Sequence, residues 1–150
     1  MKFANPNAEI FVPDGLSSDK ALERTTHMGI GAHHDDLEFM AVHGILECFH
    51  SPIKWFCGVT VTDGAGSPRA NEYAGTTDDE MRTVRRKEQN KAAEIGDYSA
   101  MVCLDYPSSA IKEPKNKDFA EDLKNIFKTA RPEVVYTHNL FDKHDAHVAV

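Results

Sequence analysis

The sequence has no excess of basic residues and no long hydrophobic run, and each absence excludes a class of protein. Its 150 residues contain 17 Lys and Arg against 24 Asp and Glu, a formal net charge of −7 at pH 7. Because an acidic chain is not drawn non-specifically to phosphate backbones or anionic lipids, we expect neither a nucleic-acid nor a membrane partner. No segment approaches the roughly 18 consecutive apolar residues of a membrane-spanning helix.

Cysteine is also scarce. Cys48, Cys57 and Cys103 are an odd number and lie in apolar runs. This pattern argues against a disulfide framework and is typical of a reducing compartment. Residues 1–19 hold no basic patch followed by an apolar stretch, so no targeting segment is expected and a cytoplasmic protein is predicted.

The chain divides at about residue 25. Residues 1–25 are polar and punctuated by proline and glycine, and we expect them to form an N-terminal extension with little regular structure. From residue 26 to residue 150, short apolar segments typical of buried strands alternate with amphipathic segments. The expected strands are 26–32, 53–62, 99–104 and 134–138, and the expected helices are 37–49, 78–96 and 117–130.

This alternation predicts the fold class. Strands separated by helices form a mainly parallel sheet with right-handed crossovers, here a Rossmann-like three-layer α/β/α fold. Numbered in chain order, the four expected strands should take the order 3-2-1-4. Ligands bind such sheets at the carboxyl ends of the strands, where the strand order reverses. The chemistry should therefore follow the first and fourth strands.

Histidine and aspartate gather at those two places. The residues concerned are His33, His34, Asp35 and Asp36 after the first strand, and His138, Asp142, His144, Asp145 and His147 after the fourth. Imidazoles and a carboxylate around an open position suit a catalytic divalent metal such as Zn²⁺. A second carboxylate beside the metal could take a proton from water, and the adjacent Asp35 and Asp36 supply both groups.

Each motif taken alone also has a plainer interpretation. Residues 33–36 could be a helix N-terminus with capping acids, and His144 and His147 could be solvated loop histidines. Their joint placement at the ends of two neighbouring strands favours a shared site.

The motifs resemble those of a known family. Residues 32–38 read Ala-His-His-Asp-Asp-Leu-Glu and resemble the Ala-His-Pro-Asp-Asp-x-Glu signature of the LmbE-like, or PIG-L, N-acetylglucosaminyl deacetylases. Residues 144–147 resemble the second motif of that family, His-x-x-His. Residues 62–67 resemble its loop after strand two, and residues 85–88 its Arg-x-x-Glu. All four segments occur in the family order.

The resemblance implies a Rossmann-like deacetylase domain over residues 26–150 and a zinc-dependent hydrolase. Its substrate would be a small N-acylated amino sugar or glycoconjugate, from which it removes an N-acetyl or similar N-acyl group. The resemblance further implies that His33, Asp36 and His147 bind Zn²⁺ and that Asp35 is the general base. His144 would polarise the amide carbonyl and stabilise the oxyanion.

Three further residues are expected on the substrate side. Glu88 interrupts the apolar stripe of the helix expected at 78–96, and a carboxylate facing the core needs a partner. Arg85 is the nearest candidate, and the pair could orient a sugar hydroxyl or be a structural salt bridge at the helix edge. Asp63 begins a glycine-rich loop that suits a hydrolase better than a phosphate cradle, because its carboxylate would repel phosphate.

Two residues depart from the family pattern. His34 stands where the family has proline, which removes a φ restraint and adds a possible competing ligand. Ala146 replaces a polar residue, so a supporting contact to the final histidine would have to come from Asp142 or Asp145.

Other functions share some of these features. A non-catalytic metal- or sugar-binding domain of the same fold would keep the ligands without turnover. Two histidines and a carboxylate also occur in non-haem iron oxygenases, although the parallel α/β pattern disfavours them. Because His147 lies three residues before Val150, we expect these residues to be the N-terminal part of a longer protein.

Overall fold

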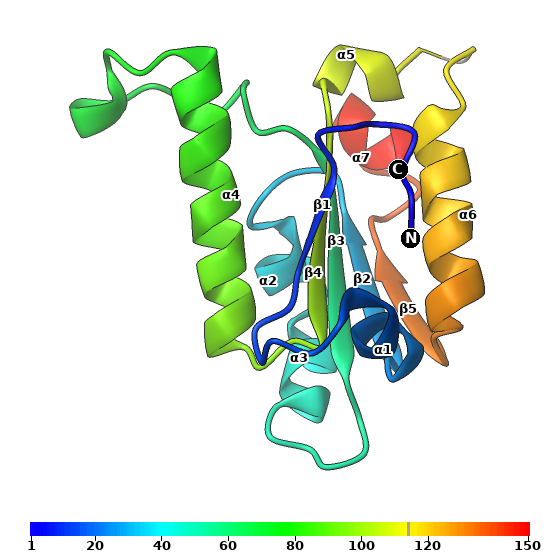
Figure 1. Ribbon diagram of the computed structural model, residues 1–150. Coiled ribbons are helices and arrows are strands. Elements are labelled where there is room, and N and C mark those ends of the chain that lie inside the picture. Colours follow the sequence, from blue (N-terminus) through cyan, green and yellow to red (C-terminus); the bar gives the residue numbers. More distant parts are fainter. Residues whose placement is uncertain (114) are drawn as a thin grey trace.

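A five-stranded sheet with helices on both faces forms the centre of the computed structural model, which describes residues 1–113 and 115–150 (Figure 1). The strand order is β1-β4-β3-β2-β5. The strands are β1 (Glu9–Phe11), β2 (His27–Gly31), β3 (Phe56–Thr62), β4 (Ala100–Tyr106) and β5 (Val134–Thr137).

The four parallel strands confirm the expected fold class and order. β3 pairs with β4, and β2 pairs with both β3 and β5, all in parallel, so the four expected strands lie as 3-2-1-4. Every residue of β2, β3 and β4 is buried, which explains their continuous apolar and small residues. β5 is the edge strand and is largely exposed.

Residues 1–25 contain more regular structure than the sequence predicts. β1 pairs antiparallel with the outer edge of β4, with Glu9 opposite Cys103. Ala8, Ile10 and Val12 pack on the same core, an alternation with the period of a strand. Helix α1 (Ser18–Glu23) buries two apolar residues against that core. The N-terminal extension is therefore part of the sheet and covers one of its edges.

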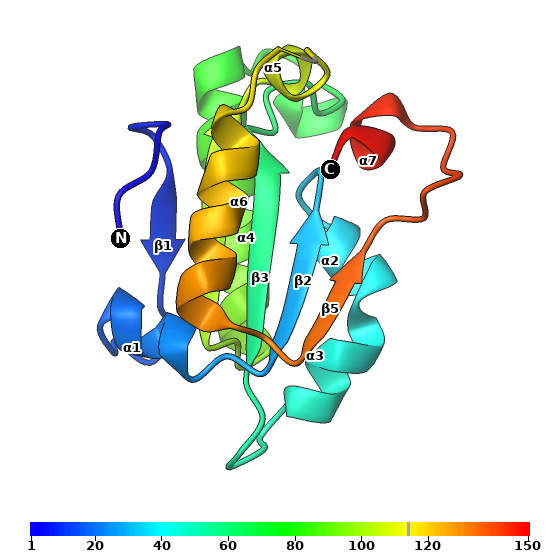
Figure 2. The same cartoon turned by 90° about the vertical axis from the view of Figure 1, so that its right-hand side faces the viewer.

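The remaining helices divide between the two faces of the sheet (Figure 1). Helices α2, α3 and α4 cover one face, whereas α1 and α6 cover the other. Their bounds are α2 (Asp36–Met40), α3 (Val42–Cys48), α4 (Asp78–Ile95), α5 (Ser108–Ile111), α6 (Asp118–Ala130) and α7 (Asp145–Ala149), with a 3₁₀ turn, η1 (Asn71–Tyr73). α5 and α7 lie beyond the carboxyl ends of the strands (Figure 2).

The helix expected at 37–49 is two helices. Ala41 has φ −111° and ψ 13°, which ends α2 and begins α3. The break lets Gly44 lie directly against the ring of Tyr136 on β5, an approach that a β-carbon at Gly44 would block.

The three cysteines lie in apolar surroundings, as the sequence analysis expects. Cys48, Cys57 and Cys103 are buried free thiols, and burial raises the pKa of both Cys57 and Cys103 to about 12. Among the residues described here, no helix is both long enough and apolar enough to cross a membrane.

Candidate metal centre and active site

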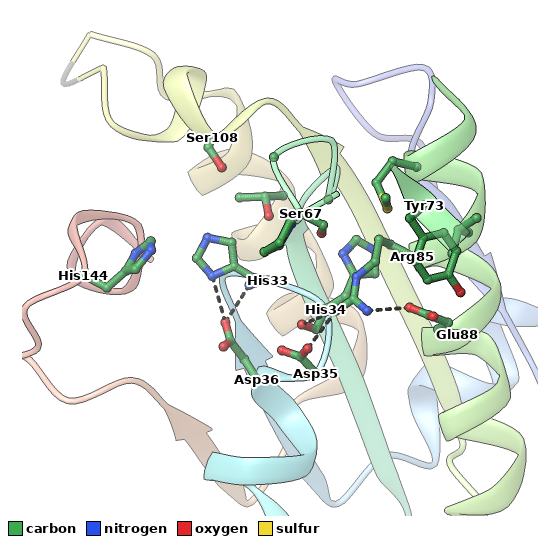
Figure 3. A pocket seen from close by; sticks show the side chains of 16 residues that line it. His33, His34, Asp35, Asp36, Ser67, Tyr73, Arg85, Glu88, Ser108 and His144 are labelled. Atoms are coloured by element: carbon green, nitrogen blue, oxygen red, sulfur yellow. Dashed lines mark hydrogen bonds and ion pairs between the residues drawn. The ribbon is translucent and has the colours of Figure 1, made fainter. Parts of the chain in front are cut away.

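The loop between β2 and α2 carries the first motif and turns sharply at Asp35. Asp35 has φ 78°, in the left-handed region that residues with a β-carbon rarely adopt. Figure 3 shows the result: Asp36 lies beside His33, whereas Asp35 lies beside Arg85. The carboxylates of Asp35 and Asp36 therefore contact different side chains, although the two residues are adjacent.

The three expected metal ligands lie together. Nδ1 of His33 is 3.3 Å from Oδ2 of Asp36 and 3.3 Å from Nε2 of His147. Nε2 of His147 is 3.5 Å from Oδ1 of Asp36. His33 lies in the loop after β2, Asp36 begins α2, and His147 lies on α7, which follows β5. The strand order brings the two motifs to one place. Two overlapping groups among the described residues could hold a divalent cation there: His33, His144 and His147, and Asp36, His138 and His147.

His144 lies beside this cluster. Its ring centroid is 4.7 Å from that of His33 and 4.5 Å from that of His147. Ligand atoms of these three histidines lie within 4.8 Å of one another. Partial burial and the nearby charges of His33 and His147 lower the pKa of His144.

Two further residues support His147. Oδ2 of Asp142 is 3.1 Å from Nδ1 of His147, so Asp142 provides the supporting contact that the sequence left open. The ring of His138 stacks on His147 at 3.9 Å with an interplanar angle of 5°. Nε2 of His138 also accepts a hydrogen bond of 2.8 Å from the backbone N–H of Ala32. His138 therefore ties the end of β5 to the end of β2.

The electrostatics favour an ionised Asp36. Burial acts to raise the pKa of Asp36, but the adjacent imidazoles of His138 and His33 and the His33 backbone N–H outweigh it and hold that pKa well below the usual range. An anionic carboxylate among imidazoles is the state that a cation requires.

On the other side of the loop, Arg85 connects the candidate base to the helix α4. Its Nη2 donates to Oδ2 of Asp35 at 2.8 Å and to the backbone carbonyl of His34 at 3.0 Å. Its Nη1 forms an ion pair with Glu88. The side chain of Glu88 is 46% exposed, so Glu88 faces an open pocket and not the core as the sequence suggested.

Residues of the β2–α2 loop line one cavity of about 500 Å³ together with Arg85, Glu88 and His144, whereas His147 lies outside its lining. The cavity walls come from the β2–α2 loop, the loop after β3, α4, α5 and the segment before α7. The lining residues include His33, Asp35, Asp36, Ser67, Tyr73, Arg85, Glu88, Ser108 and His144. Candidate metal ligands and polar groups thus share one opening (Figure 3).

A family model described as GlcNAc-PI de-N-acetylase, PIG-L, matches residues 28–150. The chain belongs to the PIG-L family. No curated protein sequence gave a match.

Solved structures share the fold of this PIG-L chain. One is the N,N'-diacetylchitobiose deacetylase from Pyrococcus horikoshii, with a TM-score of 0.67, 20% identity, and 83% of this chain aligned to 45% of that one. Another is GalB, the 4-carboxy-2-hydroxymuconate hydratase from Pseudomonas putida KT2440, with a TM-score of 0.67, 23% identity, and 83% aligned to 52%. The chain spans about half the length of these two proteins.

Two residues of this PIG-L chain lie apart from the metal cluster. His34 is 3% exposed, and it is in neither candidate metal group found among the described residues. Burial and the charges of Arg85 and Arg86 lower the pKa of His34 to about 4, so the ring is neutral. Asp63 is 5% exposed and does not line the cavity. It accepts hydrogen bonds from Nε of Arg82 at 2.8 Å and from the N–H of Ala65 at 3.0 Å.

Proposed function

We propose that this chain is a zinc-dependent hydrolase that removes an N-acetyl or similar N-acyl group from an amino sugar or its conjugate. The observation that carries the proposal is the close approach of the side chains of His33, Asp36 and His147. Zinc bonds of about 2.0–2.1 Å in a tetrahedron imply ligand separations of about 3.3 Å. Nδ1 of His33 lies 3.3 Å from Oδ2 of Asp36 and 3.3 Å from Nε2 of His147, and Nε2 of His147 lies 3.5 Å from the other Asp36 oxygen, Oδ1. Three protein ligands and one open position are typical of catalytic zinc.

A zinc ion at this position supplies a Lewis acid, which makes water a stronger acid and polarises a carbonyl group. Asp35 accepts the proton of the attacking water. Its carboxylate is 61% exposed and reaches the cavity beside Asp36. Because Asp35 pairs with Arg85 and is not among the proposed metal ligands, its carboxylate remains available as the base.

His144 acts on the opposite side of the reacting amide. Its exposed imidazole lies next to His33 and His147 at the mouth of the cavity. From there it donates a hydrogen bond to the amide oxygen as negative charge develops on it. Asp35 then returns its proton to the leaving amine.

The substrate-recognition end of the cavity is the part lined by α4 and the loop after β3. Arg85 and Glu88 present paired donors and acceptors to an opening, which suits a sugar hydroxyl. Asp63 acts indirectly, by holding the start of the loop through Ala65 and Arg82. A cytoplasmic location is proposed as well, since all three thiols are free and buried.

Zinc content and acetate release test this function together. Dialysed wild-type protein is expected to hold about one zinc per chain by elemental mass spectrometry, and Asp36→Ala to lose it. N,N'-diacetylchitobiose and N-acetylglucosamine serve as probes. Asp35→Asn should keep the zinc and lose acetate release by a factor of about 100 or more. Bound zinc without acetate release in the wild type would favour a non-catalytic metal-binding domain.

A further inference from the structure

We infer that Gln89 is a positioning residue that holds Asp35 in its left-handed conformation through a buried chain of hydrogen bonds. The inference rests on the proposed function, in which Asp35 is the base. Gln89 lies on α4, is 2% exposed and lines a small cavity that shares Asp35 and Arg85 with the catalytic one.

The hydrogen bonds connect the core to the loop and converge on the Glu38 carboxylate from both sides. The hydroxyl of Tyr98 donates to Oε1 of Glu38 at 2.9 Å. Nε2 of Gln89 donates to the same carboxylate oxygen at 2.9 Å, and Oε1 of Gln89 accepts from the backbone N–H of Asp35 at 3.0 Å. Tyr98 is buried as deeply as Gln89, at 2% exposed.

These hydrogen bonds fix which end of the Gln89 amide contacts Asp35. A carboxylate accepts hydrogen bonds and an ionised one donates none, so Glu38 must face the NH₂ group of Gln89. The amide oxygen is thereby directed at the N–H of Asp35. Burial and the adjacent Glu38 carboxylate raise the pKa of the Tyr98 phenol, which keeps Tyr98 a donor. Every link thus has a single allowed direction.

Asp35 needs this support because its backbone conformation is unfavourable. A left-handed conformation is energetically costly for a residue with a β-carbon. Helix α4 opposes that cost from two successive turns: Arg85 binds the Asp35 carboxylate, and Gln89, four residues later, binds the Asp35 N–H. Without Gln89 the N–H loses its acceptor, and the turn that aims the carboxylate into the cavity is no longer enforced.

The first test replaces Gln89 by methionine, which is similar in length and forms no comparable hydrogen bonds. Gln89→Met should fold and keep about one zinc per chain, because it touches none of His33, Asp36 and His147. On N,N'-diacetylchitobiose, kcat should fall about tenfold or more with KM changed less than about twofold. In nuclear magnetic resonance exchange measurements, protection of the Asp35 amide should fall about tenfold or more.

A rescue by exchange separates positioning from packing. Gln89→Glu alone places two carboxylates together and should lose kcat and Asp35 protection. The double variant Glu38→Gln/Gln89→Glu restores the chain: the introduced carboxylate accepts from Asp35 and from the introduced amide, whose oxygen accepts from Tyr98. The double variant should recover most of the kcat and most of the Asp35 amide protection. Asn90→Met is the matched control, since Asn90 binds Glu9 on β1 and not the loop.

The outcomes decide the inference. Unchanged kcat and Asp35 protection in Gln89→Met, or no recovery in a folded double variant, would overturn it. If Gln89→Met does not fold, recovery of protection in the double variant relative to Gln89→Glu still decides it. Asp35 protection that depends on Gln89, in a wild type that releases no acetate, would support positioning and overturn the proposed function.

Discussion

The guanidinium of Arg85 contacts two consecutive residues of the β2–α2 loop, the carbonyl of His34 at 3.0 Å and the carboxylate of Asp35 at 2.8 Å. One planar group thus fixes both a backbone oxygen and the candidate base. A lysine ammonium carries the same charge but lacks the planar fork of donors. The Arg85 contact therefore depends on geometry as well as on charge.

Arg85→Lys should lower kcat/KM for N,N'-diacetylchitobiose by about tenfold or more, because the base is no longer held in one direction. Steady-state kinetics on zinc-loaded protein provide the measurement. Arg131→Lys is the control, since Arg131 is exposed and follows α6, away from the cavity. Equal kinetic constants for the two variants would contradict the role of Arg85.

The stacked pair of His138 and His147 leads to a second prediction. His138→Phe keeps an aromatic ring against His147 but leaves the buried N–H of Ala32 without its acceptor. We expect the free energy of unfolding to fall by about 1–3 kcal/mol and the zinc affinity to fall by about 10- to 100-fold. Chemical denaturation and competition with a chromophoric chelator measure the two effects.

His43→Phe serves as the control for that variant. His43 lies on α3 with its side chain 82% exposed, so its loss should change neither quantity. Unchanged zinc affinity in His138→Phe would show that the stacked ring does not support His147.

Strand order and the metal cluster could be predicted because both depend on local patterns. β2 and β5 end in polar residues, and neighbouring parallel strands necessarily bring those residues to one edge. That placement predicts a shared site, and the resemblance to the PIG-L family implies His33, Asp36 and His147 as its ligands. The strand β1 was missed because it has only three residues and gains its hydrogen bonds from β4, about 90 residues later.

The interior of the site could not be predicted for the same reason. Gln89 forms hydrogen bonds with Glu38 and Asp35, which lie 51 and 54 positions earlier in the chain. The local pattern of α4 gives no sign that this polar side chain is buried. Asp63 was expected on the substrate side, but the direction of a side chain depends on its partners. Arg82 and Ala65 draw the Asp63 carboxylate away from the cavity.

The buried His34 makes the metal-free protein sensitive to acid. Its pKa is about 4 when folded, because of burial and the nearby arginines, against about 6.5 when unfolded. Below about pH 6.5 His34 binds a proton in the unfolded chain but stays neutral in the folded protein. The free energy of unfolding therefore falls as the pH falls towards 4. The expected contribution is a loss of about 2–3 kcal/mol between about pH 7 and pH 4.5.

Urea unfolding in the presence of a chelator, repeated across this range, measures the effect. His34→Gln should flatten the pH dependence relative to the wild type. His50→Gln should keep it, because the His50 side chain is 74% exposed. Parallel curves for His34→Gln and the wild type would show that His34 is protonated in the folded protein.

A substitution at Asp63 tests whether this residue supports the loop after β3 or binds substrate. Its carboxylate is buried and paired with Arg82, whose side chain is 34% exposed and also pairs with Asp79. Asp63→Asn should therefore lower stability by about 1–2 kcal/mol, less than a fully buried pair would cost. Thermal unfolding should show a fall in Tm of about 3–6 °C, while KM for N,N'-diacetylchitobiose should change less than about twofold.

Asp79→Asn removes the exposed partner of the same arginine and should leave Tm nearly unchanged. An unchanged Tm with a raised KM in Asp63→Asn would instead mean that Asp63 contacts the substrate.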